Sequence, residues 1–392
     1  MVEGGALWLV PGAEHPVYRR YVEFFRGLFR RFDVLDYRAA YLDEGRVSLE
    51  RRIVATLEEA RPDLLIYAQF PSSFSYLTPQ FLGSLRQRCR VVAFGFDDEI
   101  YFEQAKFFYL QCDAVITTDI PDGERLQAAG IPVHFAQLQQ PHVVLEAKAV
   151  AEDIDVSFVG DMTKPGRRDF VHALETAGLH VRDFGHGSRH GRLSDAEVLD
   201  VFRRSRINLN FTRTNPPAWV VRNHPQRAGA GQIKGRPFEL AALERFCLCE
   251  WAPCVDYWFV PGEEIGVFRD AAELIPAARL YLGDAALRER LARAAHERHR
   301  AQYAPETQFK RIFSDILGAQ RQLSHTEAKL TEPIFYESIG RSRAVAFLHS
   351  LRRARPLRAL REVAASEAMN GTYWRGFSGA LRDTVLAQLQ RS

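Results

Sequence analysis

Short apolar runs and amphipathic stretches alternate along the first third of the chain. The apolar runs are continuous instead of alternating with polar residues, a pattern typical of strands that are buried on both faces. Helical patterns such as VYRRYVEFFRGLFRRF and SLERRIVATLEEARP lie between the runs. The alternation predicts a doubly wound α/β domain with a parallel sheet. The strands are predicted at ALWLV (6–10), DVLDY (33–37), DLLIYA (63–68), VVAFGF (91–96), DAVITT (113–118) and IPVHF (131–135).

The alternation stops at residues 137–153, which we interpret as a linker, and then restarts. Helices are predicted near residue 166, from Ser194, after Pro237 and over about 270–318. Ser194 and Glu197 have the spacing of a capping box, which supports a helix start there. The second half is therefore predicted to be another doubly wound domain. Its strands are expected at IDVSFVG (154–160), HVRDFG (180–185), RINLNF (206–211), FCLCEW (246–251) and EEIGVF (263–268).

These patterns divide the chain into three regions. Residues 1–145 and 146–320 are the predicted α/β domains, and residues 321–392 form a helical tail that we expect to pack back on the first domain. The tail is basic, and two interpretations of it remain open. A basic amphipathic helix can lie on an anionic membrane surface, or its charges can be the solvated face of a packed helix. The arginines concerned are Arg341, Arg343, Arg352, Arg353, Arg355, Arg358 and Arg361.

Composition favours a cytoplasmic location and argues against nucleic acid as a partner. The chain has 392 residues and a net charge of only +3, which gives no reason to expect nucleic-acid binding. Five cysteines, Cys89, Cys112, Cys247, Cys249 and Cys254, form no disulfide or zinc pattern, so a buried strand explains FCLCEW better than a metal site. No signal peptide and no apolar run of 18 residues is evident. We therefore expect a cytoplasmic protein, with contact at the inner face of the membrane if the tail binds lipid.

The segment GQIKGRPFELAALERF (231–246) carries the strongest candidate chemistry. Gly235 permits a close turn, and Pro237 suits the first position of a helix. The helix N-terminus, Lys234 and Arg236 together predict a site for a diphosphate, with Gln232 beside it. Glu239, expected in the first turn, would accept the hydroxyls of a ribose. Ordinary complementation of the helix dipole is the alternative explanation of Glu239.

A second candidate segment, FVGDMTKPGRRDF (158–170), joins a predicted strand to a helix. The strand ends at Gly160, and the loop offers donors to the same phosphates from Thr163, Lys164, Arg167 and Arg168. The segment has neither a Walker loop nor the G-x-G-x-x-G spacing. A solvated helix start is the alternative explanation.

The first domain offers two candidates for a catalytic base. FGFDDEIYF (94–102) ends a strand in Asp97, Asp98 and Glu99, which either orient an acceptor hydroxyl or cap the next helix. His15 follows the first strand and is either a base or an exposed loop residue. The Gly- and Pro-rich stretch 210–232 is predicted to be a lid or binding loop.

With these segments in view, the chain resembles GT-B glycosyltransferases, specifically the CgeB-like group related to the large retaining GT-B transferases. INLNF, GQIKGRPFELAAL, VPGEEIGVFRDAAEL and the closing helices of residues 206–317 carry the resemblance, with FDDEIYF and CDAVITTD in the first half. It implies two Rossmann-like domains that face each other across a cleft, with an acceptor-side first domain. The second domain would hold a nucleotide-sugar donor without a metal or other cofactor.

The resemblance assigns roles to individual residues. Lys234 and Arg236 would meet the donor diphosphate, Glu239 the ribose, and Gly160 would begin the loop that faces the phosphates. Gly231 stands where many retaining relatives have a second Glu, and Glu244 and Arg245 replace a small Gly-containing segment. Retention and inversion therefore both stay open. With inversion, His15 or Asp98 would be the base.

The expected function is transfer of a sugar to a hydroxyl of a glycan, a lipid-linked saccharide or a protein. Two alternatives remain. The first is a nucleotide-sugar epimerase on the same fold, and the second is a catalytically silent GT-B-like binding subunit, which Gly231 in place of Glu favours.

Overall fold

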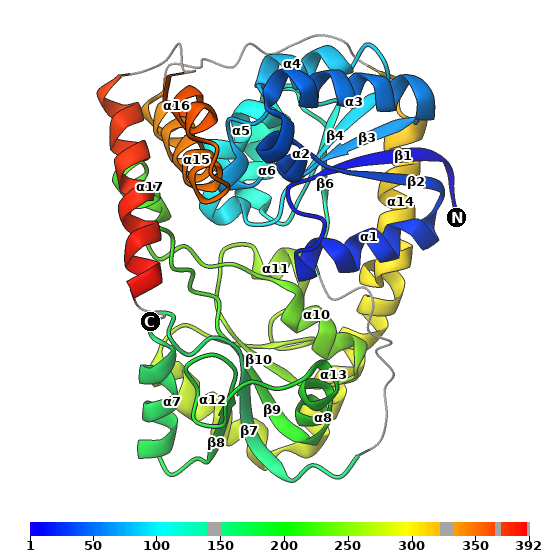
Figure 1. Cartoon of the computed structure of the whole chain (residues 1–392). Helices are drawn as coiled ribbons and strands as arrows, with labels where there is room; N and C mark the ends of the chain where they lie inside the picture. Colours follow the sequence, from blue (N-terminus) through cyan, green and yellow to red (C-terminus); the bar gives the residue numbers. More distant parts are fainter. Residues whose placement is uncertain (139–149, 322–331, 365–369, 390–392) are drawn as a thin grey trace. The chain divides into compact units, whose positions relative to one another are not determined.

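The computed structural model describes residues 1–138, 150–321, 332–364 and 370–389, and these residues form two compact units. Unit 1 comprises Met1–Phe135, Arg222–His224 and Lys310–Ser392, and unit 2 comprises Ala136–Val221 and Pro225–Phe309. Each unit is built on one sheet whose strands pair in parallel (Figure 1). The two α/β folds predicted from the sequence are confirmed. Residues 139–149 of the predicted linker lie outside the described residues.

The sheet of unit 1 has the strand order β2-β1-β3-β4-β5-β6. Strand β2 is added on one side of β1 and the later strands on the other, so the strand order reverses between β1 and β3. The inner strands β3, β4 and β5 are buried, as their continuous apolar runs require, whereas the edge strands β2 and β6 are partly exposed. Helices cover both faces of the sheet (Figure 1). The strands are β1 (Val2–Val10), β2 (Phe29–Asp36), β3 (Leu64–Tyr67), β4 (Arg90–Phe94), β5 (Ala114–Thr117) and β6 (Val133–Phe135).

The helices of unit 1 before residue 136 connect these strands. The predicted helix over 17–32 is too long, because strand β2 begins at Phe29 directly after α1. Phe29 has extended backbone angles, φ −95° and ψ 152°, and the rings of Phe25 and Phe29 lie 5.4 and 4.8 Å from that of Phe313. The helices are α1 (Pro16–Leu28), α2 (Tyr37–Glu44), α3 (Arg46–Ala60), the 3₁₀ turn η1 (Pro71–Ser73), α4 (Pro79–Leu85), α5 (Asp98–Tyr109) and α6 (Ile120–Ala128).

The sheet of unit 2 has the order β11-β10-β9-β7-β8, so its reversal lies between β7 and β9. The predicted capping box at Ser194 and Glu197 is confirmed at the start of α8. A hydrophobic core that includes Phe158, Phe170 and Phe211 lies between the sheet and its helices. The strands are β7 (Ile154–Val159), β8 (Val181–Phe184), β9 (Ser205–Asn210), β10 (Cys247–Glu250) and β11 (Gly266–Phe268).

The helices of unit 2 follow the same alternation. Cys247 and Cys249 are buried in β10 as free cysteines, and burial raises the pKa of the Cys247 thiol well above its ordinary value. The helices are α7 (Arg167–Thr176), α8 (Asp195–Arg204), the 3₁₀ turn η2 (Pro225–Arg227), α10 (Gly235–Ala242), α11 (Val255–Trp258), α12 (Ala271–Gly283), α13 (Ala285–Arg298) and the π-helical turn η3 (His299–Tyr303). Helices α9 (Ala218–Asn223) and α14 (Pro305–Gly318) contain residues of both units.

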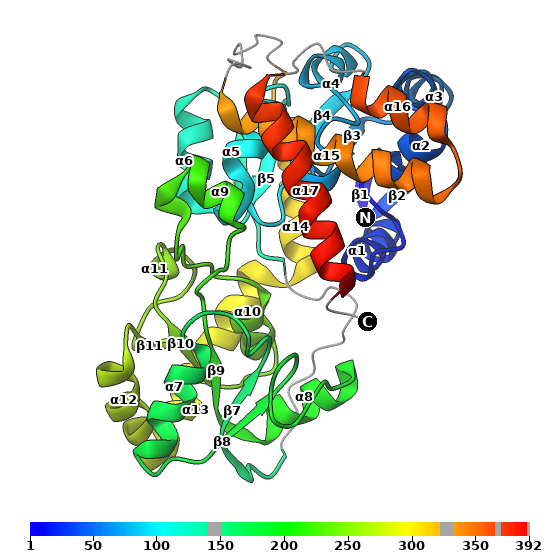
Figure 2. The same ribbon diagram turned by 60° about the vertical axis from the view of Figure 1, so that its left-hand side comes forward.

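The C-terminus is helical, as predicted, and belongs to unit 1. It contains α15 (Pro333–Arg352), α16 (Pro356–Ala364) and α17 (Gly371–Leu389). Helices α15 and α17 lie side by side (Figures 1 and 2), and close contacts between Gly340 and the main chain of Tyr373, and between Gly376 and that of Glu337, bring their backbones together. Over the described stretches of the chain, no helix combines the length and apolar character needed to cross a membrane.

Candidate functional site

The predicted diphosphate site lies at the start of α10, which follows the long stretch 210–232 after β9. The helix begins at Gly235 with Lys234 as its N-cap, so the prediction of Pro237 as the first helical residue is wrong by two positions. Pro237 fits inside the first turn because an N–H group there has no partner within the helix. Lys234 is exposed, and the first turn contains no acidic residue. The electrostatics of this helix start therefore favour an anion.

Glu239 lies in the second turn of α10 and not in the first, because the helix begins at Gly235. Its carboxylate is buried and accepts a hydrogen bond from Arg236 Nη1 at 2.8 Å. The Arg236 guanidinium also lies 4.5 Å from the centre of the Phe202 ring. Complementation of the helix dipole therefore does not explain Glu239, and its partner is a cation on the same helix.

The loop between β7 and α7 contains the second set of predicted donors. Asp161 Oδ1 accepts hydrogen bonds from the Thr163 main-chain N–H at 2.9 Å and from its hydroxyl at 2.6 Å. Burial raises the pKa of Asp161, but these hydrogen bonds outweigh it and hold the pKa below its ordinary value. The exposed Thr163 therefore already donates to an anion inside the loop. Lys164 is half-buried in the same loop.

Arg167, the first residue of α7, is buried and faces into the loop. Its Nη1 and Nη2 atoms donate to the main-chain oxygens of Asp161 and Phe211, at 2.9 and 3.4 Å, and its guanidinium lies over the Phe158 ring. Arg168 donates to the main-chain oxygen of Gly187 at 3.2 Å. Both arginines thus bind main-chain carbonyls here and shape the loop.

Gly160 is placed by the glycine that follows the neighbouring strand β8. Gly185 has a φ of +114°, and a Cβ atom there would lie 2.1 Å from the Gly160 oxygen. The Gly160 N–H donates to the Phe184 oxygen at 2.8 Å. The loops after β7 and β8 therefore pack backbone against backbone, which only glycine at position 185 allows.

Glu250 and Arg213 lie between the start of α7 and the stretch that leads to α10. The sequence analysis missed both residues. Glu250, buried at the end of β10, accepts from the Thr212 N–H at 2.9 Å and pairs with Arg213 Nε at 2.7 Å. The Arg213 side chain also approaches the start of α7, since a Cβ atom on Gly166 would lie 2.9 Å from Arg213 Nη1. A carboxylate ending an otherwise apolar strand was the available signal.

The long stretch 210–232 begins and ends in an antiparallel contact. Arg213 bridges Gly231, and the N–H of the buried Gln232 donates to the Thr212 oxygen at 3.0 Å. A Cβ atom on Gly231 would lie 2.9 Å from the Ala252 Cβ. The chain therefore leaves little room for any side chain at position 231. The antiparallel contact also joins the end of β9 to the start of α10.

These contacts place both segments of the predicted donor site at the carboxyl ends of the unit 2 strands. Gly160, Thr163, Lys164 and Arg167 follow β7, whereas Gln232, Lys234, Arg236 and Glu239 follow the hairpin after β9. The strand order reverses between β7 and β9, and parallel α/β sheets bind ligands outside the carboxyl ends of strands at such a reversal.

In unit 1, Asp98 is the first residue of α5 and is buried at 2% exposure. Its two oxygens accept hydrogen bonds from the hydroxyls of Tyr109 and Thr117, at 2.6 and 2.5 Å. Burial raises the pKa of Asp98 to about 6, against the lowering effect of these two hydroxyls. The carboxyl group links α5 to β5 in the interior, so this geometry favours a structural role over general-base catalysis.

His15 is the exposed N-cap of α1 in the loop after β1, at the strand reversal of unit 1. Its ring lies 5.6 Å from that of Tyr18, which in turn lies 5.0 Å from Phe96 in the loop after β4. The exposed imidazole is thus placed at the edge where ligands bind in this topology.

Further carboxylates near Asp98 were missed, because they follow the next strand, β5. Asp119 and Asp122 are buried, and burial with the hydrogen bond to Asp122 raises the pKa of Asp119 well above its ordinary value. Glu99, which the sequence analysis did name, accepts from the Thr118 hydroxyl at 3.0 Å beside them. The segment TTDIPDGER carried this signal in its acidic residues, although their shared burial depends on the fold.

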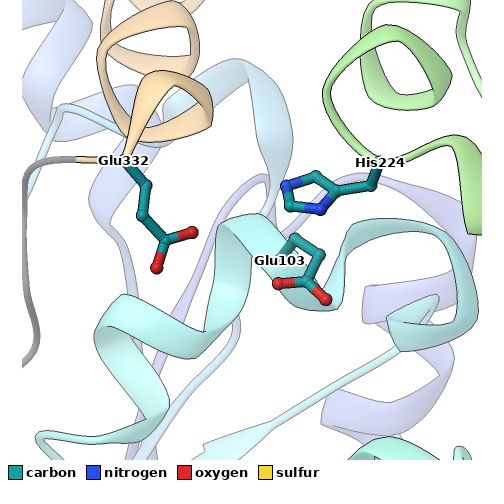
Figure 3. A group of neighbouring side chains, drawn as sticks. All are labelled: Glu103, His224 and Glu332. Carbon is teal, nitrogen blue, oxygen red and sulfur yellow. The ribbon is translucent and has the colours of Figure 1, made fainter.

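Glu103, His224 and Glu332 are the one group within the described residues whose ligand atoms are close enough for a metal, within 4.8 Å of one another (Figure 3). Lys106 Nζ lies 2.8 Å from a carboxylate oxygen of both Glu103 and Glu332, and Arg125 lies 2.7 Å from Glu103. Although burial raises the pKa of Glu103, these cations lower it to about 2. The chain's own cations therefore balance this group.

Comparisons with known proteins give a family match over part of the chain and structural matches to its fold. Residues 166–314 match the model of a family described as glycosyl transferase-like. No curated protein matches the sequence. Among solved structures, HepE of Anabaena in complex with UDP-glucose is 10% identical, with a TM-score of 0.57. The match covers 81% of this chain and 100% of the HepE chain.

Two further structures agree with this fold. Sucrose-phosphate synthase from Thermosynechococcus elongatus is 12% identical with a TM-score of 0.55, covering 82% of this chain and 100% of its own. A glycosyltransferase from Rickettsia africae is 11% identical with a TM-score of 0.54, covering 81% and 100%. The GT-B fold expected from the sequence is thereby confirmed, while membership of the CgeB-like group stays a prediction.

Proposed function

We propose that the protein is a glycosyltransferase that moves a sugar from a nucleoside-diphosphate sugar to a hydroxyl group of an acceptor. The observation that carries this proposal is the start of α10, where an exposed lysine and an Arg–Glu pair stand beside a helix N-terminus free of acidic residues. The glycosyl transferase-like match, over residues 166–314, covers this helix and the stretch 210–232 before it, and it begins just after the loop of Gly160, Thr163 and Lys164.

In this proposal, Lys234 and the first-turn N–H groups of α10 bind the donor diphosphate. They stabilise the negative charge that develops on it as the glycosidic bond breaks, which replaces the role of a metal. Arg236 holds the Glu239 carboxylate at 2.8 Å, and Glu239 accepts the two ribose hydroxyls. The loop of Gly160, Thr163 and Lys164 faces the phosphates of the bound donor. Arg167 and Gln232 support the backbone of this site.

The acceptor binds unit 1 in this proposal, and it is a glycan, a lipid-linked saccharide or a protein. An inverting reaction requires a base to take the proton of the acceptor hydroxyl, and the exposed His15 suits this task better than the buried Asp98. A retaining reaction requires no such base, because the leaving phosphate can take the proton. Proton NMR of the product's anomeric centre decides between the two.

The test is a thermal-shift panel of UDP, GDP, dTDP and CMP sugars on the full chain, followed by measurement of donor hydrolysis. A ligand present at about 100 times its Kd stabilises the folded chain by roughly 2.7 kcal/mol, so one nucleotide class should raise the Tm clearly. UDP-glucose comes first, because HepE was solved with it.

Variants connect the panel to the proposed site. Lys234→Ala should reduce the shift, whereas Lys310→Ala, which changes a lysine on α14, should leave it unchanged. Absence of any shift across the panel contradicts the proposal. Conversion of the donor sugar without an acceptor would indicate an epimerase, and binding without hydrolysis or transfer would indicate a silent subunit.

A further inference from the structure

Helix α16 turns its leucines outward. Leu357 and Leu360, one helical turn apart, are 76% and 62% exposed, and Leu351 near the end of α15 is 45% exposed. Exposed leucines occur singly on most proteins, but three within ten residues form a local apolar patch.

The opposite face of α16 packs against unit 1 through charged groups. Glu362 is buried and accepts hydrogen bonds from the Tyr41 hydroxyl and from Arg343, both at 2.7 Å. Arg358 donates to the main-chain oxygens of Tyr41 and Asp43 in α2, beside which α16 lies (Figure 2). Rotation of the helix to bury its leucines would expose this ionic network and break its hydrogen bonds, so the outward position of the leucines is fixed by the fold.

The residues around the leucines are basic. Residues 351–361 contain five arginines and no acidic residue. Arg352, Arg353, Arg355 and Arg361 are exposed, whereas Arg358 faces inward. Of the four, Arg353 also pairs with Asp43 at 3.3 Å, and Arg355 donates to the Asp43 main-chain oxygen at 3.4 Å. Of the remaining tail arginines, Arg343 is buried in the network with Glu362, and Arg341 pairs with Asp383. Four exposed arginines of the tail therefore stand close in sequence to Leu351, Leu357 and Leu360, while Arg375 and Arg382 of α17 are also exposed.

We propose that these three leucines and four exposed arginines, the α16 surface, bind an anionic lipid bilayer. An anionic bilayer offers a partner for both kinds of side chain on this surface: acyl chains for the leucines and lipid phosphates for the guanidinium groups. The packed-helix and membrane interpretations of the tail thus apply to opposite faces of the same helix. The contact is peripheral and independent of the reaction proposed above.

The experiment is co-flotation of the purified full chain with phosphatidylcholine vesicles that contain or lack phosphatidylglycerol. We expect binding only with phosphatidylglycerol, weakened by added salt. Leu357→Ser with Leu360→Ser should reduce the partition coefficient at least about ten-fold. Arg352→Gln with Arg361→Gln should reduce it roughly 25-fold, at about five-fold for each charge. Leu280→Ser, which alters a 54% exposed leucine of α12, is the matched control and should bind as the wild type does.

The outcomes separate the proposal from its rivals. Because both leucines are exposed, the double variant should keep the wild-type Tm and circular dichroism spectrum. The arginine pair tests the same surface without changing its apolar side chains. Wild-type protein that stays with the buffer, or that binds neutral vesicles equally well, overturns the proposal. A dimer that the leucine variant dissociates, without vesicle binding, would assign the surface to a second copy of the chain.

Discussion

Removal of the Glu239 carboxylate should abolish the distinction between a ribose and a dideoxyribose. If Glu239 accepts the two ribose hydroxyls, wild-type protein should bind the selected nucleoside diphosphate better than its 2′,3′-dideoxy analogue. Hydrogen bonds to a charged acceptor contribute about 1.5–3 kcal/mol, which corresponds to roughly 10- to 150-fold in Kd. Glu239→Ala should bind both nucleotides with the same, weaker affinity.

The comparison of two ligands is needed because Arg236 and Glu239 are paired at 2.8 Å with side chains only 28% and 10% exposed. Loss of Glu239 frees the positive charge of Arg236, and this charge can strengthen the diphosphate contact and hide the lost ribose contact. The ratio of the two Kd values cancels that effect, since both ligands carry the same diphosphate.

Isothermal titration calorimetry measures all four Kd values at one salt concentration. Glu244→Gln changes a half-exposed carboxylate just beyond α10 and should keep the wild-type ratio. If Glu239→Ala retains the wild-type preference for the ribose, Glu239 does not contact the sugar, and its role is limited to holding Arg236.

Three further predictions concern stability. Glu250→Ala leaves the buried Thr212 N–H without its acceptor and should cost about 1–3 kcal/mol in urea unfolding, with a smaller loss for Glu250→Gln, and an unchanged midpoint would contradict this. Gly178→Ala (φ +82°, no atom within 4 Å) should cost about 1–2 kcal/mol, and Gly185→Ala clearly more, because its Cβ meets Gly160; equal midpoints would refute the packing argument. The folded chain binds the Asp98 proton more tightly than the unfolded chain does, so its contribution to stability is fully present below pH 3.8 and is lost as the pH rises through about 6. Asp98→Asn should flatten the pH dependence of the urea midpoint in that window, and an unchanged slope would exclude Asp98 as its source.

The strands and the fold were predictable because a buried parallel strand requires a continuous apolar run, and residues such as 64–67 and 91–94 show it directly. The start of α10 was located to within two residues, since Gly235 and Pro237 are both compatible with a first turn. Boundaries were less certain where a helix and a strand share one pattern, as at Phe29.

The links between segments were not predictable. Glu250 meets Arg213 only because β9 and β10 pair in one register, and nothing in either local sequence specifies that register. The same holds for Asp98, whose hydroxyl partners lie 11 and 19 residues away. For α16 the basic, amphipathic pattern was visible, but the pattern alone does not state which face turns inward. That choice depends on Tyr41, 321 residues from Glu362.

The division of unit 1 along the chain has a consequence for biosynthesis. Its sheet is complete by residue 135, yet Arg343 and Glu362, which form a hydrogen-bonded group with Tyr41, are synthesised only after the whole of unit 2. Unit 2 is nearly continuous and can finish folding while the first-made half still waits. A nascent chain therefore carries an incomplete unit 1 while unit 2 is being synthesised, and this incomplete unit is the part that chaperones would have to protect.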